Sequence, residues 1–137
     1  MSRELLEVPS VHATGGSYAH AARVGNLLFV AGQVDKNKEN KFVGLGDVEA
    51  QTRHVIANLA SILETAGGSL SSIVKYTTYL TDESFLEGYR RARNDCMPKP
   101  MPPARWRSFR VWRVRTHLSR SRPSPCSTNS RYLAERN

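Results

Sequence analysis

The segment HAARVGNLLFVAGQ, residues 20–33, decides the fold class. Its apolar run, residues 27–31, follows Gly25-Asn26 and precedes Gly32-Gln33, a pattern that is typical of a buried strand entered through a tight turn. Residues 20–24 are expected to form the antiparallel partner of this strand. The segment therefore predicts a β-hairpin, from which the rest of the domain can be built outward.

The clearest helix of the sequence follows the hairpin after a polar loop. Asp47 is a plausible N-cap, Glu49 places a negative charge in the first turn, and Gly67-Gly68 end the helix. Apolar residues recur at spacings of three and four along it, namely Val55, Ile56, Leu59, Ile62 and Leu63. This spacing predicts an amphipathic helix that packs one face on a sheet.

Two further strands and a second helix complete the expected domain. Residues 73–80 are rich in β-branched and aromatic side chains and predict a strand. A shorter helix is expected to begin at Thr81-Asp82 and to run through Phe85, Tyr89 and Ala92. A last strand starts near Arg105. The order of hairpin, helix, strand, helix and strand predicts an α+β domain, with both helices on one face of a mixed sheet.

The length and composition exclude several classes of protein. A chain of 137 residues and 15.3 kDa has room for about one domain. No apolar run approaches the roughly 18 to 20 residues that span a bilayer, and residues 1–16 do not have the pattern of a secretory signal. Two cysteines, Cys96 and Cys126, are too few for a disulfide framework or a metal cage. We expect a soluble cytoplasmic domain without a membrane partner.

The net charge of +8 comes entirely from the end of the chain. Residues 1–104 contain eleven basic and eleven acidic side chains, whereas residues 105–137 contain nine arginines and one acid, Glu135. We therefore divide the chain into a domain at residues 1–105 and an atypical Arg/Ser-rich tail at residues 106–137. At face value the tail is a disordered extension that could bind RNA.

The body of the chain resembles the RidA/YjgF family of enamine/imine deaminases, also called L-PSP endoribonucleases. The resemblance covers residues 10–105 in unbroken order, and its matching segments are residues 16–20, 24–33, 51–52, 58–59, 74–82 and 103–105. It implies a chorismate-mutase-like α+β fold that forms a homotrimer, with its sites in the clefts between subunits.

The resemblance also implies an activity and the residues that perform it. Family members hydrolyse 2-aminoacrylate and related 2-imino acids to 2-keto acids and ammonia, and they need no metal or organic cofactor. Arg105 matches the family's carboxylate clamp, and a guanidinium suits that role because two N–H donors meet two oxygens. The backbone N–H of Gly32 matches a second donor to the same carboxylate, and Tyr18 matches the tyrosine that lines the pocket.

Other positions depart from the family pattern. Ala31 stands where Ser or Thr is common, and Tyr89 stands where many deaminases have Asn, so we expect a substrate pocket of altered shape at both positions. The family closes with a strand of the type V-E-[IV]-E-A-[IV]-A, whose glutamate positions the water. The written tail contains no such segment. We expect the chain to lack its closing strand and to turn over substrate poorly.

Our hypothesis for the origin of the tail is a frameshift. With GC-rich codons chosen for residues 106–130, reading from the third base gives ALVPGLARPDPFVEVEAVAVLDEQ, which contains the family's ending. The recovered glutamate spans the codons of Ser119 and Arg120. We therefore interpret residues 106–137 as the product of a shifted reading frame, in the gene or in its sequencing.

Three functions remain from these observations, in decreasing order of preference. The first is an imine deaminase, the second is a protein that binds 2-keto acids without turning them over, and the third is an RNA-binding or endoribonuclease-like protein. The histidines, His12, His20, His54 and His117, lack metal-ligand spacing, so no metal is expected. A passive thiol is the favoured interpretation of Cys96.

Overall fold

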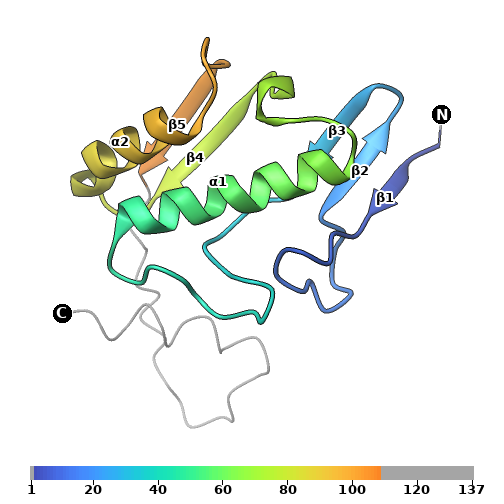
Figure 1. The fold of residues 1–137 in the computed structure, drawn as a ribbon, viewed down its shortest axis with the longest axis horizontal. Coiled ribbons are helices and arrows are strands. Elements are labelled where there is room, and N and C mark those ends of the chain that lie inside the picture. The colour runs from blue at the N-terminus through green and yellow to red at the C-terminus, as the bar shows by residue number, and fades with distance from the viewer. Residues whose placement is uncertain (1, 109–137) are drawn as a thin grey trace, which may run out of the picture.

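The computed structural model describes residues 2–108 of the chain (Figure 1). Its strands are β1 (Glu4–Leu6), β2 (Ala21–Val24), β3 (Leu27–Val30), β4 (Tyr76–Leu80) and β5 (Ala104–Ser108). Its α-helices are α1 (Val48–Thr65) and α2 (Leu86–Cys96), and single 3-10 turns occur at Leu70–Ser72 and Glu83–Phe85.

The predicted hairpin is confirmed. Strands β2 and β3 pair antiparallel, with Ala21 opposite Val30 and Val24 opposite Leu27. Gly25 closes the turn at a φ of 57°, a conformation that favours glycine over other residues. The sequence did not predict β1, a three-residue strand that pairs antiparallel with β2. So short a segment shows no alternation that could reveal it.

Helix α1 has the boundaries that its caps predict. The Asp47 side chain accepts hydrogen bonds from the backbone N–H groups of Glu49 and Ala50, at 2.9 and 3.1 Å. These bonds satisfy two of the donors that every helix leaves free at its start. The chain turns out of the helix at Gly67, which has a φ of 80°.

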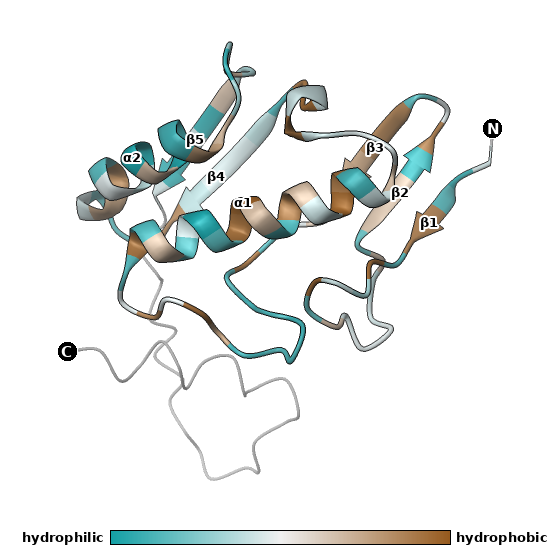
Figure 2. Ribbon diagram, in the orientation of Figure 1, coloured by the Kyte–Doolittle hydropathy of each residue, from teal (hydrophilic) through white to brown (hydrophobic). Residues whose placement is uncertain are grey.

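The apolar stripe of α1 packs on the strands of the first half. Ile62 is fully buried and forms a cluster with Val8, Val11 and Ala21, against which side chains of β1 and β3 also pack. Figure 2 shows the hydrophobic residues on β3 and along α1. Arg23 on β2 adds a polar tie, because its guanidinium donates to the carbonyl of Ala66 just beyond the helix. The core of the first half therefore lies between α1 and the three-stranded sheet.

The second half is a β-α-β unit. Strands β4 and β5 pair parallel, and α2 connects them. Strand β4 begins at Tyr76 rather than at Ile73, because residues 70–72 form a 3-10 turn first. Asp82 caps a second 3-10 turn by accepting from the N–H of Ser84, so α2 begins at Leu86 and not at Thr81-Asp82.

The α+β class is confirmed, and the two helices lie on the same side of the strands (Figure 1). The predicted single sheet is divided within residues 2–108. One sheet has the order β1-β2-β3, and the other consists of β4 and β5. Helix α1 lies across both groups of strands and also packs on α2.

The close approach of α1 and α2 depends on Gly88. A Cβ atom at this buried position would lie 2.5 Å from Cγ1 of Val48 and 3.4 Å from Cγ of Glu49. We expect Gly88→Ala to lower the free energy of unfolding by about 1–3 kcal/mol, the usual effect of overpacking. Urea denaturation followed by circular dichroism measures this loss.

The double variant Val48→Ala/Gly88→Ala is the control, because it removes the atom that the new methyl group would meet. Its loss of stability should be smaller than the sum of the two single losses. A Gly88→Ala protein as stable as the parent would contradict the importance of this close approach, because the two helices could then move apart without a loss of stability.

Candidate functional site

Tyr18 and two buried histidines form a hydrogen-bonded cluster beside the hairpin. The hydroxyl of Tyr18 lies 3.0 Å from Nε2 of His12. Tyr18 is 46% exposed, whereas His12 and His20 are each 3% exposed. The two imidazole rings meet edge to face, with their centroids 5.7 Å apart. An exposed phenol is thus held in place by a buried ring.

The hydrogen bonds of His20 define its tautomer. Its Nδ1 accepts from the backbone N–H of Val8 at 3.0 Å, so its Nε2 carries the proton and donates to the carbonyl of His12 at 2.8 Å. The Glu7 carboxylate also lies 3.0 Å from Nδ1.

The environment of His12 favours its neutral form. Burial lowers the pKa of the His12 imidazole, and the nearby His20 and Lys36 lower the same pKa further. Within the described residues, Nδ1 of His12 is buried and has no hydrogen-bond partner. A neutral ring of this kind can exchange a proton with the Tyr18 hydroxyl through Nε2.

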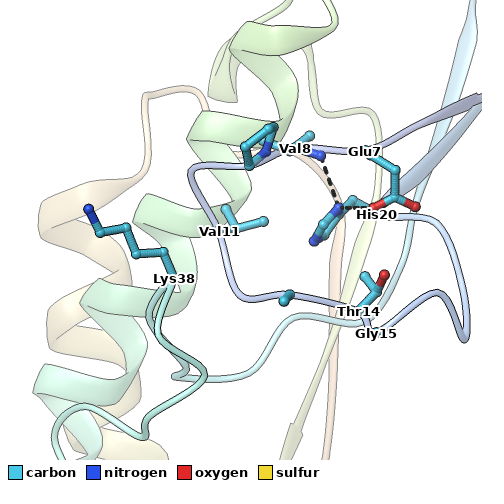
Figure 3. Close-up of a pocket in the computed structure, with 9 residues that line it drawn as sticks. Glu7, Val8, Val11, Thr14, Gly15, His20 and Lys38 are labelled. Atoms are coloured by element: carbon cyan, nitrogen blue, oxygen red, sulfur yellow. Dashed lines mark hydrogen bonds and ion pairs between the residues drawn. The ribbon is translucent and has the colours of Figure 1, made fainter.

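A small hollow adjoins this cluster and has a volume of about 290 Å³ (Figure 3). It is lined by Glu7, Val8, Pro9, Val11, Ala13, Thr14, Gly15, His20 and Lys38. Figure 3 shows His20 between Val8 and Glu7, to which its ring is joined by dashed lines. None of the residues expected to bind substrate lines this hollow, so it is not the predicted site.

Ala31 and Gly32 follow the end of β3 and connect to the same cluster. The N–H of Ala31 donates to the carbonyl of His20 at 2.9 Å. Because backbone direction alternates along an extended chain, the N–H of Gly32 should turn away from β2. Gly32 is exposed, and a Cβ atom there would meet no atom within 4 Å. The predicted backbone donor therefore borders open space.

Arg105 lies in the other sheet, on β5. It is exposed, and it stands opposite Thr77 of β4 in the register. Thr78 and Trp106 form the next pair, and the Thr78 hydroxyl bonds to Tyr89 of α2. Side chains alternate between the two faces of a sheet, so Arg105 projects from the face opposite the helices.

Gly32 and Arg105 lie at opposite ends of the strands. Strands β3 and β5 point in the same general direction in Figure 1; Gly32 follows the end of β3, and Arg105 is the second residue of β5. No described hydrogen bond or hollow includes both residues. A single protomer therefore does not bring the two predicted carboxylate donors together.

Tyr89 is placed inside the protomer. It is 5% exposed, and its hydroxyl lies 2.8 Å from Oγ1 of Thr78. The guanidinium of Arg93 lies over its ring at 5.5 Å from the centroid. Tyr89 thus joins α2 to β4, and its assignment to the substrate pocket stays a prediction.

Sequence reasoning missed the role of His12. Its eight-residue separation from His20 is not a spacing typical of metal ligands, and only the folded loop places the imidazole beside Tyr18.

Among residues 2–108, no group of three or more His, Cys, Asp or Glu side chains is placed to hold a metal ion. In the same part of the chain, no helix has the length and apolar character needed to cross a membrane.

This fold, with the hairpin, the two helices and the parallel pair, is that of the YjgF/RidA class of α+β proteins. Residues 10–113 match the family described as Endoribonuclease L-PSP. The chain belongs to this family, which confirms the resemblance to RidA/YjgF proteins.

Relatives in Pyrococcus abyssi and Schizosaccharomyces pombe agree with this assignment. A RutC family protein of Pyrococcus abyssi is 42% identical over 82 residues, which are 60% of this chain and 65% of that protein. The mitochondrial protein mmf2 of Schizosaccharomyces pombe is 39% identical over 88 residues, 64% of this chain and 68% of that protein. The match to the Pyrococcus abyssi protein thus spans less than two thirds of its length.

Solved structures show the same fold. The crystal structure of RidA from the Antarctic bacterium Psychrobacter sp. PAMC 21119 has a TM-score of 0.72 at 27% identity, covering 77% of this chain and 85% of that one. A structure described as a putative endoribonuclease from Thermotoga maritima has a TM-score of 0.72 at 28% identity, covering 77% and 84%.

The lowered pKa of His12 gives the stability of the domain a dependence on pH. The unfolded chain takes up a proton near pH 6.5, while folded His12 resists it. This contribution is therefore present above pH 6.5 and is lost as the pH falls from there toward the folded pKa. The slope for one proton is at most about 1.4 kcal/mol per pH unit.

Urea midpoints at pH 7.5 and 5.5 test this for the parent and for His12→Gln. The variant should lose less stability between the two values than the parent does, because it has no group that gains a proton on unfolding at this position. Equal losses in the two proteins would contradict the assignment to His12.

Proposed function

We propose that this protein descends from an imine deaminase that hydrolyses 2-aminoacrylate-type acids to 2-keto acids and ammonia. The observation that carries the proposal is the retention of the family's substrate residues on accessible surface. Arg105 is exposed on β5, Gly32 borders open space, and Tyr18 presents a hydrogen-bonded phenol. Membership of the family supports the same conclusion.

The proposed reaction asks little of the protein. The enamine tautomerises to an imine, and water adds to the imine carbon while one of its protons moves to the nitrogen, which gives a carbinolamine. The remaining hydroxyl proton then moves to the amino group as the carbon–nitrogen bond breaks, and ammonia and a 2-keto acid leave. The site needs to hold the carboxylate, to place one water and to manage one or two protons.

Arg105 and the N–H of Gly32 are assigned to the carboxylate. The planar guanidinium offers two parallel N–H donors to the two oxygens. Tyr18 is assigned to proton handling, because the residue is partly exposed and its hydroxyl lies within hydrogen-bond distance of neutral His12. No cofactor enters these steps.

The separation of Arg105 from Gly32 favours a site shared between subunits. Because the two donors lie at opposite ends of the strands in one protomer, a neighbouring copy would supply one of them. Large apolar side chains are exposed on β1 and β3, including Leu5 at 56%, Leu27 at 57% and Phe29 at 61%. Such a surface supports the proposed homotrimer.

The written chain is expected to turn over poorly. The family places a glutamate of its closing strand beside the attacking water, and residues 106–137 contain a single acid, Glu135. A protein that keeps Arg105 and lacks this glutamate fits the second candidate, which is binding of 2-keto acids without turnover. Both candidates use the same carboxylate clamp.

Arg105→Ala should abolish most of the binding that the two candidates share. Charge-assisted hydrogen bonds contribute about 1.5–3 kcal/mol, so the affinity for pyruvate or 2-oxobutyrate should fall about 10- to 100-fold. Calorimetric titration of the full chain measures this. Arg107→Ala is the matched control, since Arg107 lies two residues further along the exposed strand β5.

An affinity that Arg105→Ala leaves unchanged would contradict the clamp. Pyruvate release from enzymatically generated 2-aminoacrylate then separates the candidates, measured for the written chain and for a chain with the reading frame restored. Acceleration in neither protein would exclude the deaminase. Cleavage of an RNA substrate, measured in parallel, tests the third candidate, an endoribonuclease, which is the activity in the family's description.

A further inference from the structure

His12 is a buried titratable side chain in the loop between β1 and β2, and the proposed reaction gives it no role of its own. Its Nε2 lies 3.0 Å from the hydroxyl of Tyr18. Its other ring nitrogen, Nδ1, is buried and has no hydrogen-bond partner among residues 2–108. In this part of the chain, Tyr18 is therefore the side chain on which the His12 ring can act through a hydrogen bond.

The loop that carries the His12 ring is anchored in the core. Nε2 of His20 donates to the carbonyl of His12 at 2.8 Å, and Nδ1 of His20 accepts from the N–H of Val8 at 3.0 Å. Val8 and Val11, in the same loop, are buried in the cluster that α1 covers. The imidazole is thus held beside Tyr18 by the packing and the hydrogen bonds of its own loop.

The His12 ring carries one proton at neutral pH. Burial lowers the pKa of its imidazole, and the neighbours His20 and Lys36 lower the same pKa further. A neutral imidazole donates from one nitrogen and accepts at the other. The bond to Tyr18 therefore has one of two directions, in which either His12 donates to the phenol oxygen or the phenol donates to His12.

The nitrogen without a partner distinguishes the two directions. If the phenol donated to Nε2, the proton of the ring would lie on Nδ1, and a buried N–H group would have no acceptor among residues 2–108. Buried N–H groups without an acceptor are rarer in folded proteins than acceptors without a donor. The structure therefore favours a proton on Nε2, which donates to the oxygen of Tyr18.

A phenol oxygen that accepts from His12 keeps its own proton for another partner. Tyr18 is partly exposed, and within residues 2–108 its hydroxyl has no second hydrogen bond. The nitrogen of a 2-imino acid and the keto oxygen of its product are both acceptors. Either atom would therefore suit the free proton of the Tyr18 hydroxyl.

We propose that His12 is a positioning residue, which donates from Nε2 to the oxygen of Tyr18 and so directs the Tyr18 hydroxyl toward the nitrogen or keto oxygen of a bound acid. The inference rests on the proposed function, because that function supplies the acid. When Tyr18 gives its proton to the imine nitrogen, the bond from His12 stabilises the phenolate. The phenolate then takes a proton from the water that adds to the carbon, so Tyr18 ends the step as it began.

NMR of the full 137-residue chain with ¹⁵N-labelled histidine tests the direction of the bond without a ligand. At neutral pH, Nε2 of His12 should have the resonance of a protonated ring nitrogen and Nδ1 that of an unprotonated one. Tyr18→Phe should shift the Nε2 resonance, because it removes the acceptor. A proton on Nδ1 would overturn the proposal. Since no substrate is used, this result does not depend on whether the protein is a deaminase.

Calorimetric titration with pyruvate tests the action of His12 on a ligand. His12→Met removes the donor and keeps a side chain of similar size, whereas His12→Gln keeps an N–H donor. His12→Met should weaken binding about 2- to 10-fold, the usual effect of one neutral hydrogen bond, and His12→Gln should recover most of the affinity. In a Tyr18→Phe background, His12→Met should have no further effect.

Two results of the titration would also overturn the proposal. The first is an equal loss from His12→Met in the parent and in the Tyr18→Phe background, which would show that His12 supports the loop and does not act through Tyr18. The second is an equal affinity of the parent and of His12→Met. A parent chain that binds no pyruvate would contradict the proposed function, and the NMR measurement decides the inference about His12 in that case.

Discussion

The packing of α1 across two groups of strands holds the described part of the chain together. Its C-terminal half buries Ile62 against the cluster of Val8, Val11 and Ala21. Its N-terminal half meets α2, where Gly88 permits close approach and Arg91 forms an ion pair with Glu49 at 2.6 Å. No strand ladder joins the two sheets within residues 2–108, so the helix carries the connection between them.

Much of this architecture is local enough to be predicted from sequence. The hairpin is specified by its apolar run and its glycine turn, and α1 by Asp47 and Gly67 at its ends. The errors occur where tertiary context decides. Residues 73–75 have strand-like side chains but follow a 3-10 turn, and β1 exists only because β2 offers it an edge.

The candidate site was less predictable than the fold. Arg105 and Gly32 were identified through the family resemblance. The structure places Arg105 on β5 and Gly32 just after β3, which belongs to the other sheet. Tyr89 stands where many deaminases have Asn, and in this chain its side chain is buried. Its hydroxyl forms a hydrogen bond with the hydroxyl of Thr78 inside the protomer. His12 could not be identified from the sequence, because only the folded loop brings its imidazole within hydrogen-bond distance of Tyr18. Contacts between loops and between subunits leave no periodic pattern in the sequence, so they cannot be predicted in the way that helices and strands can.

The division of the sheet has a consequence for the life of this protein in a cell. Within residues 2–108, the outer edges of β3 and β4 have no paired strand, and together with exposed side chains such as Leu27 and Phe29 they resemble the templates from which ordered aggregates grow. Chaperones and proteases recognise such surfaces as signs of incomplete folding. Surfaces of this kind make the steady-state abundance of a protein depend on quality control as much as on its synthesis.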